Sequence, residues 1–70
     1  PFHQGFAIEG GLIERFLKAA ARLLKRNGEA LFVVNQFIPL PRYAAALFAE
    51  HELLCEQDGF RVYRLKKMAD

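Results

Sequence analysis

The sequence has few of the features that stabilise small domains or place them in a membrane. It has one cysteine, Cys55, in 70 residues, which excludes an internal disulfide, and it has no Cys/His cluster with zinc-ligand spacing. An unpaired cysteine is typical of the cytoplasm, where we expect the protein to reside. No apolar run approaches the roughly 20 residues that span a bilayer, because Arg15, Lys18, Arg22 and Lys25 interrupt the longest stretches. We therefore expect no membrane partner.

The sequence also lacks a large excess of either charge. Ten Lys and Arg residues oppose eight Asp and Glu residues, giving a net charge of +2, which only weakly favours an anionic partner. With 53% hydrophobic residues, the composition excludes a disordered tail. A chain of this length buries only about 60% of its unfolded surface, so an isolated domain would be marginal. We expect residues 1–70 to be part of a larger domain.

The first half of the sequence has the period of an amphipathic helix. After an irregular segment at residues 1–5 and a flexible pair at Gly10-Gly11, the spacing predicts a helix over residues 12–26. Asn27-Gly28 is typical of a left-handed helix stop. The apolar face comprises Leu12, Ile13, Phe16, Leu17, Ala20, Leu23 and Leu24.

The second half has strand and turn signals. Residues 29–35 form a short apolar run that predicts a strand buried on both faces, as in parallel sheets. Pro41 is suited to the first residue of a second helix. Residues 52–57 and 60–66 are strand-like, and Asp58-Gly59 between them predicts a hairpin turn. Cys55 would be a buried small hydrophobe.

These elements predict an α/β fold in the order helix, parallel strand, helix, antiparallel β-hairpin. A buried parallel strand needs a parallel neighbour, which this sequence does not contain, and we expect that strand to end just before Pro1. The uncovered strand edge predicts self-association of the isolated chain.

Three sequence motifs carry a family resemblance. Pro1-Phe2-His3, residues 27–29 with 34–41, and residues 59–64 together resemble class I S-adenosylmethionine-dependent methyltransferases. More narrowly, they resemble the bacterial guanine-N2 methyltransferases of small-subunit ribosomal RNA, whose signature is Asn-Pro-Pro-Phe-His. The sequence departs from that family because the Asn, the first Pro and the preceding glycine-rich cofactor half are absent.

The resemblance implies that residues 1–70 are the C-terminal half of a Rossmann-like methyltransferase domain. The parent enzyme would transfer a methyl group from S-adenosylmethionine to the exocyclic N2 amino group of a guanine in 16S ribosomal RNA. Its partner would be ribosomal RNA or the small ribosomal subunit. The fragment alone would be inactive, because the cofactor site would lie mostly outside it.

The same resemblance assigns roles to the first residues. Methylation of an exocyclic amine requires its lone pair to point at the methyl group, which hydrogen-bond acceptors can achieve. Pro1 would shape the acceptor loop, because proline has a fixed φ and no competing N–H donor. Phe2 would stack on a flipped base. His3 would lie near the base or a phosphate, with an ordinary structural role as the alternative.

Two further groups of residues are candidates for substrate binding. Asn35, Gln36 and Phe37 follow a predicted parallel strand, at the edge of the sheet where ligands bind in open α/β folds. Arg15, Lys18 and Arg22 would contact the RNA backbone or, alternatively, form an ordinary solvated helix face.

Two alternative functions stay open. Similar Pro-Pro-aromatic loops occur in methyltransferases that act on large-subunit RNA, on adenine in DNA or on protein glutamine. The chain would otherwise be a non-catalytic basic α/β module that binds RNA or protein.

Overall fold

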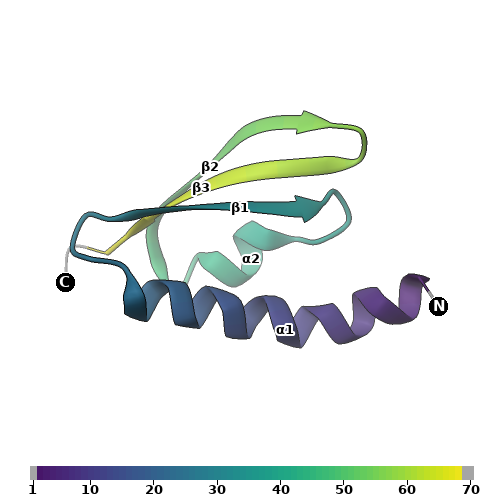
Figure 1. The fold of residues 1–70 in the computed structure, drawn as a ribbon, viewed down its shortest axis with the longest axis horizontal. Helices are drawn as coiled ribbons and strands as arrows, with labels where there is room; N and C mark the ends of the chain where they lie inside the picture. Colours follow the sequence, from purple (N-terminus) through teal and green to yellow (C-terminus); the bar gives the residue numbers. More distant parts are fainter. Residues whose placement is uncertain (1, 69–70) are drawn as a thin grey trace.

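The computed structural model describes the backbone of residues 2–68 and the side chains of residues 11–68. Two helices and three strands occur in this part of the chain (Figure 1). In chain order they are α1 (Phe2–Leu23), β1 (Glu29–Asn35), α2 (Leu40–Ala44), β2 (Phe48–Gln57) and β3 (Phe60–Lys67).

The strands form one sheet in which the last strand of the sequence is central. The order is β1-β3-β2, and β3 pairs antiparallel with both neighbours. β1 and β2 therefore run in the same direction on either side of β3. The β2–β3 connection is the expected two-residue turn, with φ of 55° at Asp58 and 83° at Gly59, as a type I′ turn requires. The predicted hairpin is confirmed.

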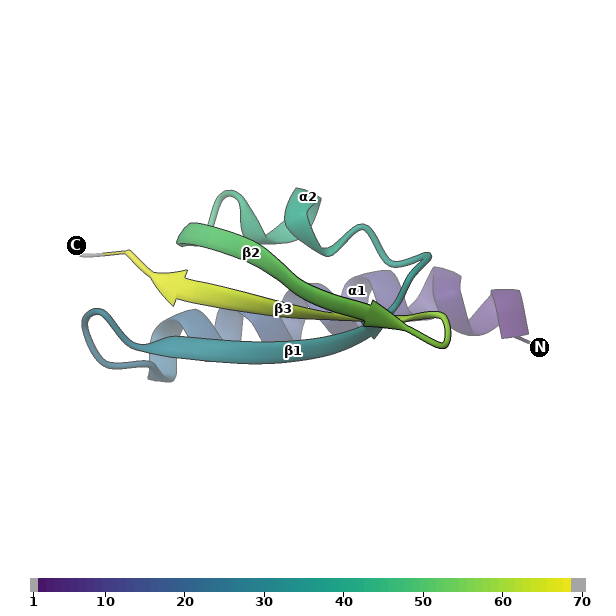
Figure 2. The ribbon, with the colours of Figure 1, turned by 90° about the horizontal axis from the view of Figure 1, so that it is seen from above.

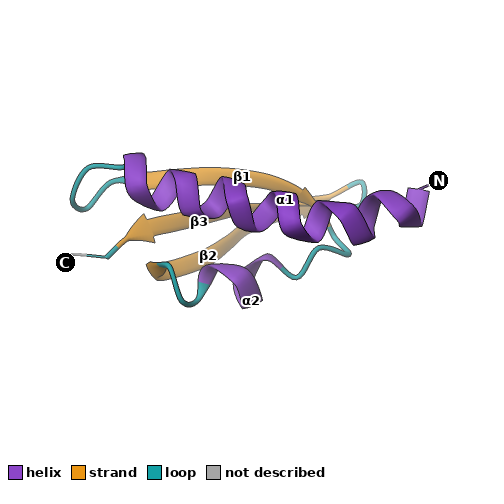
Figure 3. Cartoon of the chain, turned by 90° about the horizontal axis from the view of Figure 1, so that it is seen from below, coloured by secondary structure: helices purple, strands orange, loops and turns teal. Residues whose placement is uncertain are grey.

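Both helices pack on one face of the sheet, and the described part of the chain leaves the other face bare (Figures 2 and 3). The core lies between the layers and takes side chains from every element, because alternate residues of each strand point towards the helices. Its buried members are Leu17, Val34, Ile38, Leu40, Ala44, Phe48, Tyr63 and Leu65.

α1 is longer at its N-terminus than the spacing predicted. It begins at Phe2 and includes the glycines at positions 10 and 11, so the irregular segment expected over residues 1–5 is wrong for residues 2–5, and the flexible entry is wrong as well. A glycine in a helix costs about 1 kcal/mol relative to alanine but does not end the helix, and no proline lies between residues 2 and 38. Nothing in this stretch therefore stops a helix.

At its C-terminus, α1 ends at Leu23, three residues before the expected end. Asn27 has the left-handed φ of 63° that the Asn-Gly pair predicted. The Gly28 N–H donates to the Lys25 carbonyl at 2.7 Å. A Cβ at position 28 would lie 2.8 Å from that oxygen, so the connection to β1 needs glycine there.

The apolar stripe of α1 that contacts the core is narrower than expected. Leu17 is fully buried, and Ile13, Ala20 and Leu24 pack against the core. Phe16 and Leu23, which were expected on the apolar face, are exposed. A single helix over a narrow sheet buries only the residues that point directly at it.

β1 has the predicted bounds but not the predicted burial. Its side chains alternate, and Leu31 and Val33 are 65% and 66% exposed, so burial on both faces is wrong. Its described neighbour is the antiparallel strand β3, and a parallel neighbour stays a prediction. Cys55, expected to be buried, is exposed on β2.

α2 and β2 both begin earlier in the sequence than predicted. α2 begins at Leu40, one residue before the expected first residue Pro41, so the proline still lies in the first turn, where its missing N–H breaks no helical hydrogen bond. β2 begins at Phe48, four residues before the predicted start, because the Phe48 side chain completes the core. No helix in the described part of the chain is long and apolar enough to cross a membrane.

Candidate functional site

The loop that follows β1 has a backbone fixed by its own hydrogen bonds. The Phe37 N–H donates to Oδ1 of Asn35 at 2.9 Å, and the Ile38 N–H donates to the Asn35 carbonyl at 3.0 Å. Such an Asx turn is a common use of asparagine at the end of a strand. Ile38 is buried in the core and anchors the loop. The backbone of Phe37 is fixed by the first of these bonds, and the residue is 69% exposed.

The same loop is joined to the hairpin turn. The Gln36 N–H donates to the Gly59 carbonyl at 2.8 Å, and Asn35 lies opposite Phe60 in the sheet register. Phe60 is also exposed, so two exposed phenylalanines lie at this end of the sheet. α1 begins at the same end of the molecule (Figures 1 and 2). The β1 loop, the hairpin turn and the start of α1 therefore share one end of the fold.

The expected base-binding residues at the start of the sequence fall at the limit of the described chain. Pro1 lies outside the described residues. Phe2 and His3 lie in the first turn of α1, not in a loop, and their side chains are outside the described part. Their proposed roles stay predictions.

The three cationic candidates lie on the surface of α1. Arg15, Lys18 and Arg22 are all exposed, as either a solvated helix face or an RNA-binding face requires. The hydrogen bonds of the β1 loop given above involve none of them. The structure thus brings Asn35, Gln36 and Phe37 together but does not join the cations to them.

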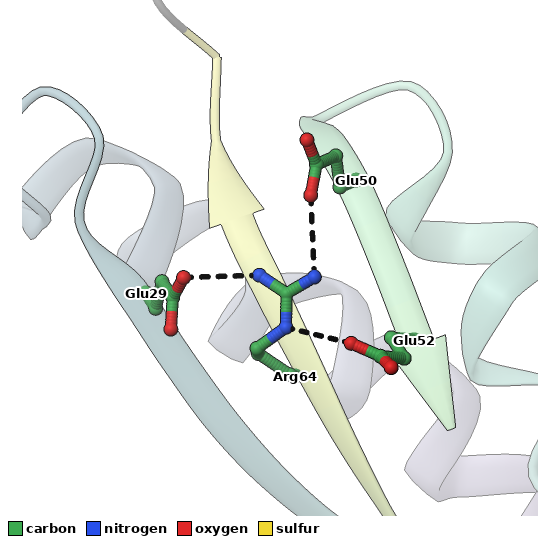
Figure 4. Close-up of polar contacts among 4 residues, drawn as sticks. All are labelled: Glu29, Glu50, Glu52 and Arg64. Carbon is green, nitrogen blue, oxygen red and sulfur yellow. Dashed lines mark hydrogen bonds and ion pairs between the residues drawn. The ribbon is translucent and has the colours of Figure 1, made fainter. Parts of the chain in front are cut away.

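A charged cluster on the bare face of the sheet was not predicted. Arg64 on β3 donates from Nε to Glu52 at 3.0 Å, from Nη1 to Glu29 at 3.0 Å and from Nη2 to Glu50 at 3.2 Å (Figure 4). The hydrogen bonds to Glu52 and then Glu50 raise the pKa of Arg64. We call these four residues the Arg64 cluster. Only the strand order reveals it, because β3 places Arg64 between glutamates of β1 and β2.

The side chains of residues 11–68 do not fit the requirements of an S-adenosylmethionine site. Nucleotide-like cofactors in such folds need a glycine-rich loop between a strand and a helix and a carboxylate for the ribose. Gly28 instead precedes a strand and Gly59 lies in a hairpin. The sheet carboxylates bind arginines, three on Arg64 and Glu56 on Arg61. Among the described residues, no group of three or more acidic, His or Cys side chains could hold a metal ion.

The fold and the family comparison together define the class of protein. A family model described as "Methyltransferase small domain" matches residues 1–64, and the chain belongs to this methyltransferase family. S-adenosylmethionine is the general methyl donor of such enzymes.

The relatives narrow the family. The chain is 39% identical to a "Ribosomal RNA small subunit methyltransferase C" of Chromohalobacter salexigens over 96% of its own length and 20% of the relative. A protein of the same description from Hahella chejuensis is 36% identical over 90% of the chain and 18% of that protein. One from Enterobacter sp. strain 638 is 34% identical over 91% and 19%. The expected family is confirmed, and the chain spans about a fifth of these relatives.

Proposed function

We propose that this chain is the C-terminal part of an S-adenosylmethionine-dependent methyltransferase that modifies the exocyclic N2 amino group of a guanine in 16S ribosomal RNA. The observation that carries the proposal is the match along almost the whole chain to proteins described as ribosomal RNA small subunit methyltransferases. The substrates would be ribosomal RNA or the small ribosomal subunit, in the cytoplasm.

The role of this chain is to orient the target base. Pro1 would shape the loop that accepts the amino hydrogens, and Phe2, in the first turn of α1, would stack on the base with His3 beside it. Asn35 fixes the loop at Phe37 through the 2.9 Å hydrogen bond, and Gln36 attaches that loop to the hairpin. An exposed aromatic ring on a fixed backbone is suited to stacking on an unpaired base. Arg15, Lys18 and Arg22 would contact phosphates along α1.

The completed domain is Rossmann-like. β1 pairs with β3 along one edge, and the described part of the chain places no strand along the other. A parallel strand from the rest of the domain fills that edge. In the isolated chain the same edge pairs with a second copy, so sedimentation should show association that grows with concentration.

The isolated chain should be inactive, because residues 11–68 do not fit the cofactor. Calorimetric titration with S-adenosylmethionine should give no heat of binding. Tight binding to the 70-residue chain would contradict this.

Activity is tested by a chimera in which this chain replaces the matching segment of the Chromohalobacter salexigens relative. The assay measures methyl transfer to 16S ribosomal RNA and identifies the methylated nucleoside by mass spectrometry. Stacking of one base is worth about 1–3 kcal/mol, so Phe37→Ala should lower kcat/KM by about 5- to 150-fold.

Phe16→Ala is the matched control, because Phe16 is also an exposed phenylalanine but lies on α1. It should leave kcat/KM unchanged. Equal losses in both variants would contradict the role of Phe37. Methylation of adenine, of large-subunit RNA or of protein, or no transfer by a folded chimera, would contradict the proposed reaction.

A further inference from the structure

An ion pair lies at the end of the sheet where β2 and β3 are joined. Arg61 is two residues past Gly59 on β3 and lies opposite Glu56 on β2. Its Nε atom is 3.3 Å from Oε2 of Glu56. Arg61 is also two residues from Tyr63, which is buried in the core, so both side chains point to the side of the sheet that the helices cover.

Arg61 differs from the other arginine of β3 in how much of its guanidinium is engaged. In the Arg64 cluster each guanidinium nitrogen donates to a carboxylate. In the described part of the chain Arg61 has one ion pair, and its Nε is buried without a hydrogen bond. A hydrogen bond with Tyr63 and the charge of Glu56 raise the pKa of Arg61, so the side chain is held in place as a cation. Because a guanidinium has five N–H donors and this side chain is 34% exposed, it keeps donors for a ligand.

Arg61 lies beside the β1 loop. It is opposite Val34 in the register, and the Gln36 N–H donates to the carbonyl of Gly59, two residues before Arg61. The loop then turns to the same side of the sheet, because Ile38 is buried in the core. The guanidinium and the β1 loop therefore lie at the same end and on the same side of the sheet.

We propose that Arg61 binds an RNA phosphate next to the nucleotide whose base stacks on Phe37, with Glu56 holding the guanidinium in place. The planar fork of arginine binds a phosphate through two N–H groups at once. Such contacts fix the register of a nucleic acid on a protein, whereas contacts to the bases read its sequence. The inference rests on the proposed function in taking RNA as the substrate.

The salt dependence of RNA binding measures this contact. The assay is the dissociation constant of the chimera with the Chromohalobacter salexigens relative for a 16S ribosomal RNA transcript, between about 50 and 200 mM KCl. Arg61→Gln should weaken binding by about tenfold. It should also make the slope of log affinity against log salt shallower by about 0.7 to 0.9, the value for one phosphate. An unchanged slope in a variant that is folded by circular dichroism would overturn the proposal.

Lys66→Gln is the matched control. Lys66 is also on β3, but it is five residues from Arg61, so its side chain points to the opposite side of the sheet. The substitution removes the same charge and should leave the affinity and the slope unchanged. Equal changes in the two variants would assign the effect to net charge and overturn the proposal.

Glu56→Gln separates phosphate binding from a structural role of the ion pair. Glutamine retains an oxygen near Arg61 but removes a negative charge that repels phosphate. The variant should therefore bind RNA at least as tightly as the parent chimera. A structural ion pair predicts the opposite, because loss of either partner would disturb the same end of the sheet. Weaker binding by Glu56→Gln would overturn the proposal.

Arg61→Lys keeps the test possible should Arg61→Gln not fold. Lysine retains the charge but lacks the planar fork, so the variant should retain the slope and bind RNA about threefold more weakly. An unchanged affinity would overturn the proposal.

Methyl transfer is measured separately from RNA binding. A chimera that modifies no guanine but whose RNA binding changes as expected supports the Arg61 contact and contradicts only the proposed reaction. A chimera that methylates guanine, with RNA binding unchanged in Arg61→Gln, contradicts only the contact. A folded chimera that binds no RNA would overturn the contact as well.

Discussion

Replacement of Leu17 by alanine tests whether one residue attaches α1 to the sheet. Leu17 is fully buried and belongs to the core that also takes residues from β1, α2, β2 and β3. Truncation of a fully buried leucine costs about 2–5 kcal/mol, depending on how far the cavity collapses. Domains have about 0.05–0.15 kcal/mol of stability per residue, which gives about 3.5–10 kcal/mol for this chain. The substitution should therefore remove about a fifth of the total or more.

The assay is urea unfolding of the 70-residue chain followed by circular dichroism at 222 nm. For a small domain the free energy of unfolding falls by about 1 kcal/mol per molar urea, so the midpoint of Leu17→Ala should fall by about 2 M or more.

Leu23→Ala is the matched control, with the same substitution on the same helix at a side chain that is 73% exposed. Its free energy of unfolding should change by no more than about 0.5 kcal/mol. Equal midpoints for the two variants would refute the packing of α1 on the sheet.

Two further substitutions, each paired with a comparison variant, test the connections on either side of β1. Gly28→Ala should destabilise the chain by about 1–3 kcal/mol in the same urea assay, because the new Cβ meets the Lys25 carbonyl at 2.8 Å. Gly11→Ala, where a Cβ meets nothing within 4 Å, should instead stabilise the helix by about 0.5–1 kcal/mol. Asn35→Ala should speed hydrogen exchange at the Phe37 amide by removing its acceptor, whereas Asn35→Asp, which retains an acceptor oxygen, should not. Unchanged exchange in Asn35→Ala would contradict the Asx turn.

The features that could be predicted from sequence depend on neighbouring residues. The turn at Asp58-Gly59 was predictable because both residues have positive φ, which few residue types adopt at low cost. Asn35, Gln36 and Phe37 were candidates because they stand at the end of an expected parallel strand, where ligands bind in open α/β folds. The family resemblance was also local, because it depends on short motifs.

The features that were missed depend on strand order. The period of residues 29–35 shows an apolar strand, but it does not show that the strand pairs antiparallel with β3 or has one bare face. The Arg64 cluster joins residues that are 12, 14 and 35 positions apart in sequence. The early start of α1 was missed because two adjacent glycines weaken a helix without stopping it.

The central position of β3 affects the order in which the sheet forms. β1 and β2 are both complete in the sequence before Phe60, yet each of them pairs with β3 and not with the other. During translation, no native pair of these strands can assemble until residues 60–67 leave the ribosome, and Val34 of β1 lacks its core neighbours on β3 until then. A stop codon ahead of Phe60 would remove β3 and with it both strand pairings of this sheet. Both helices and two of the three strands would still be present in the sequence.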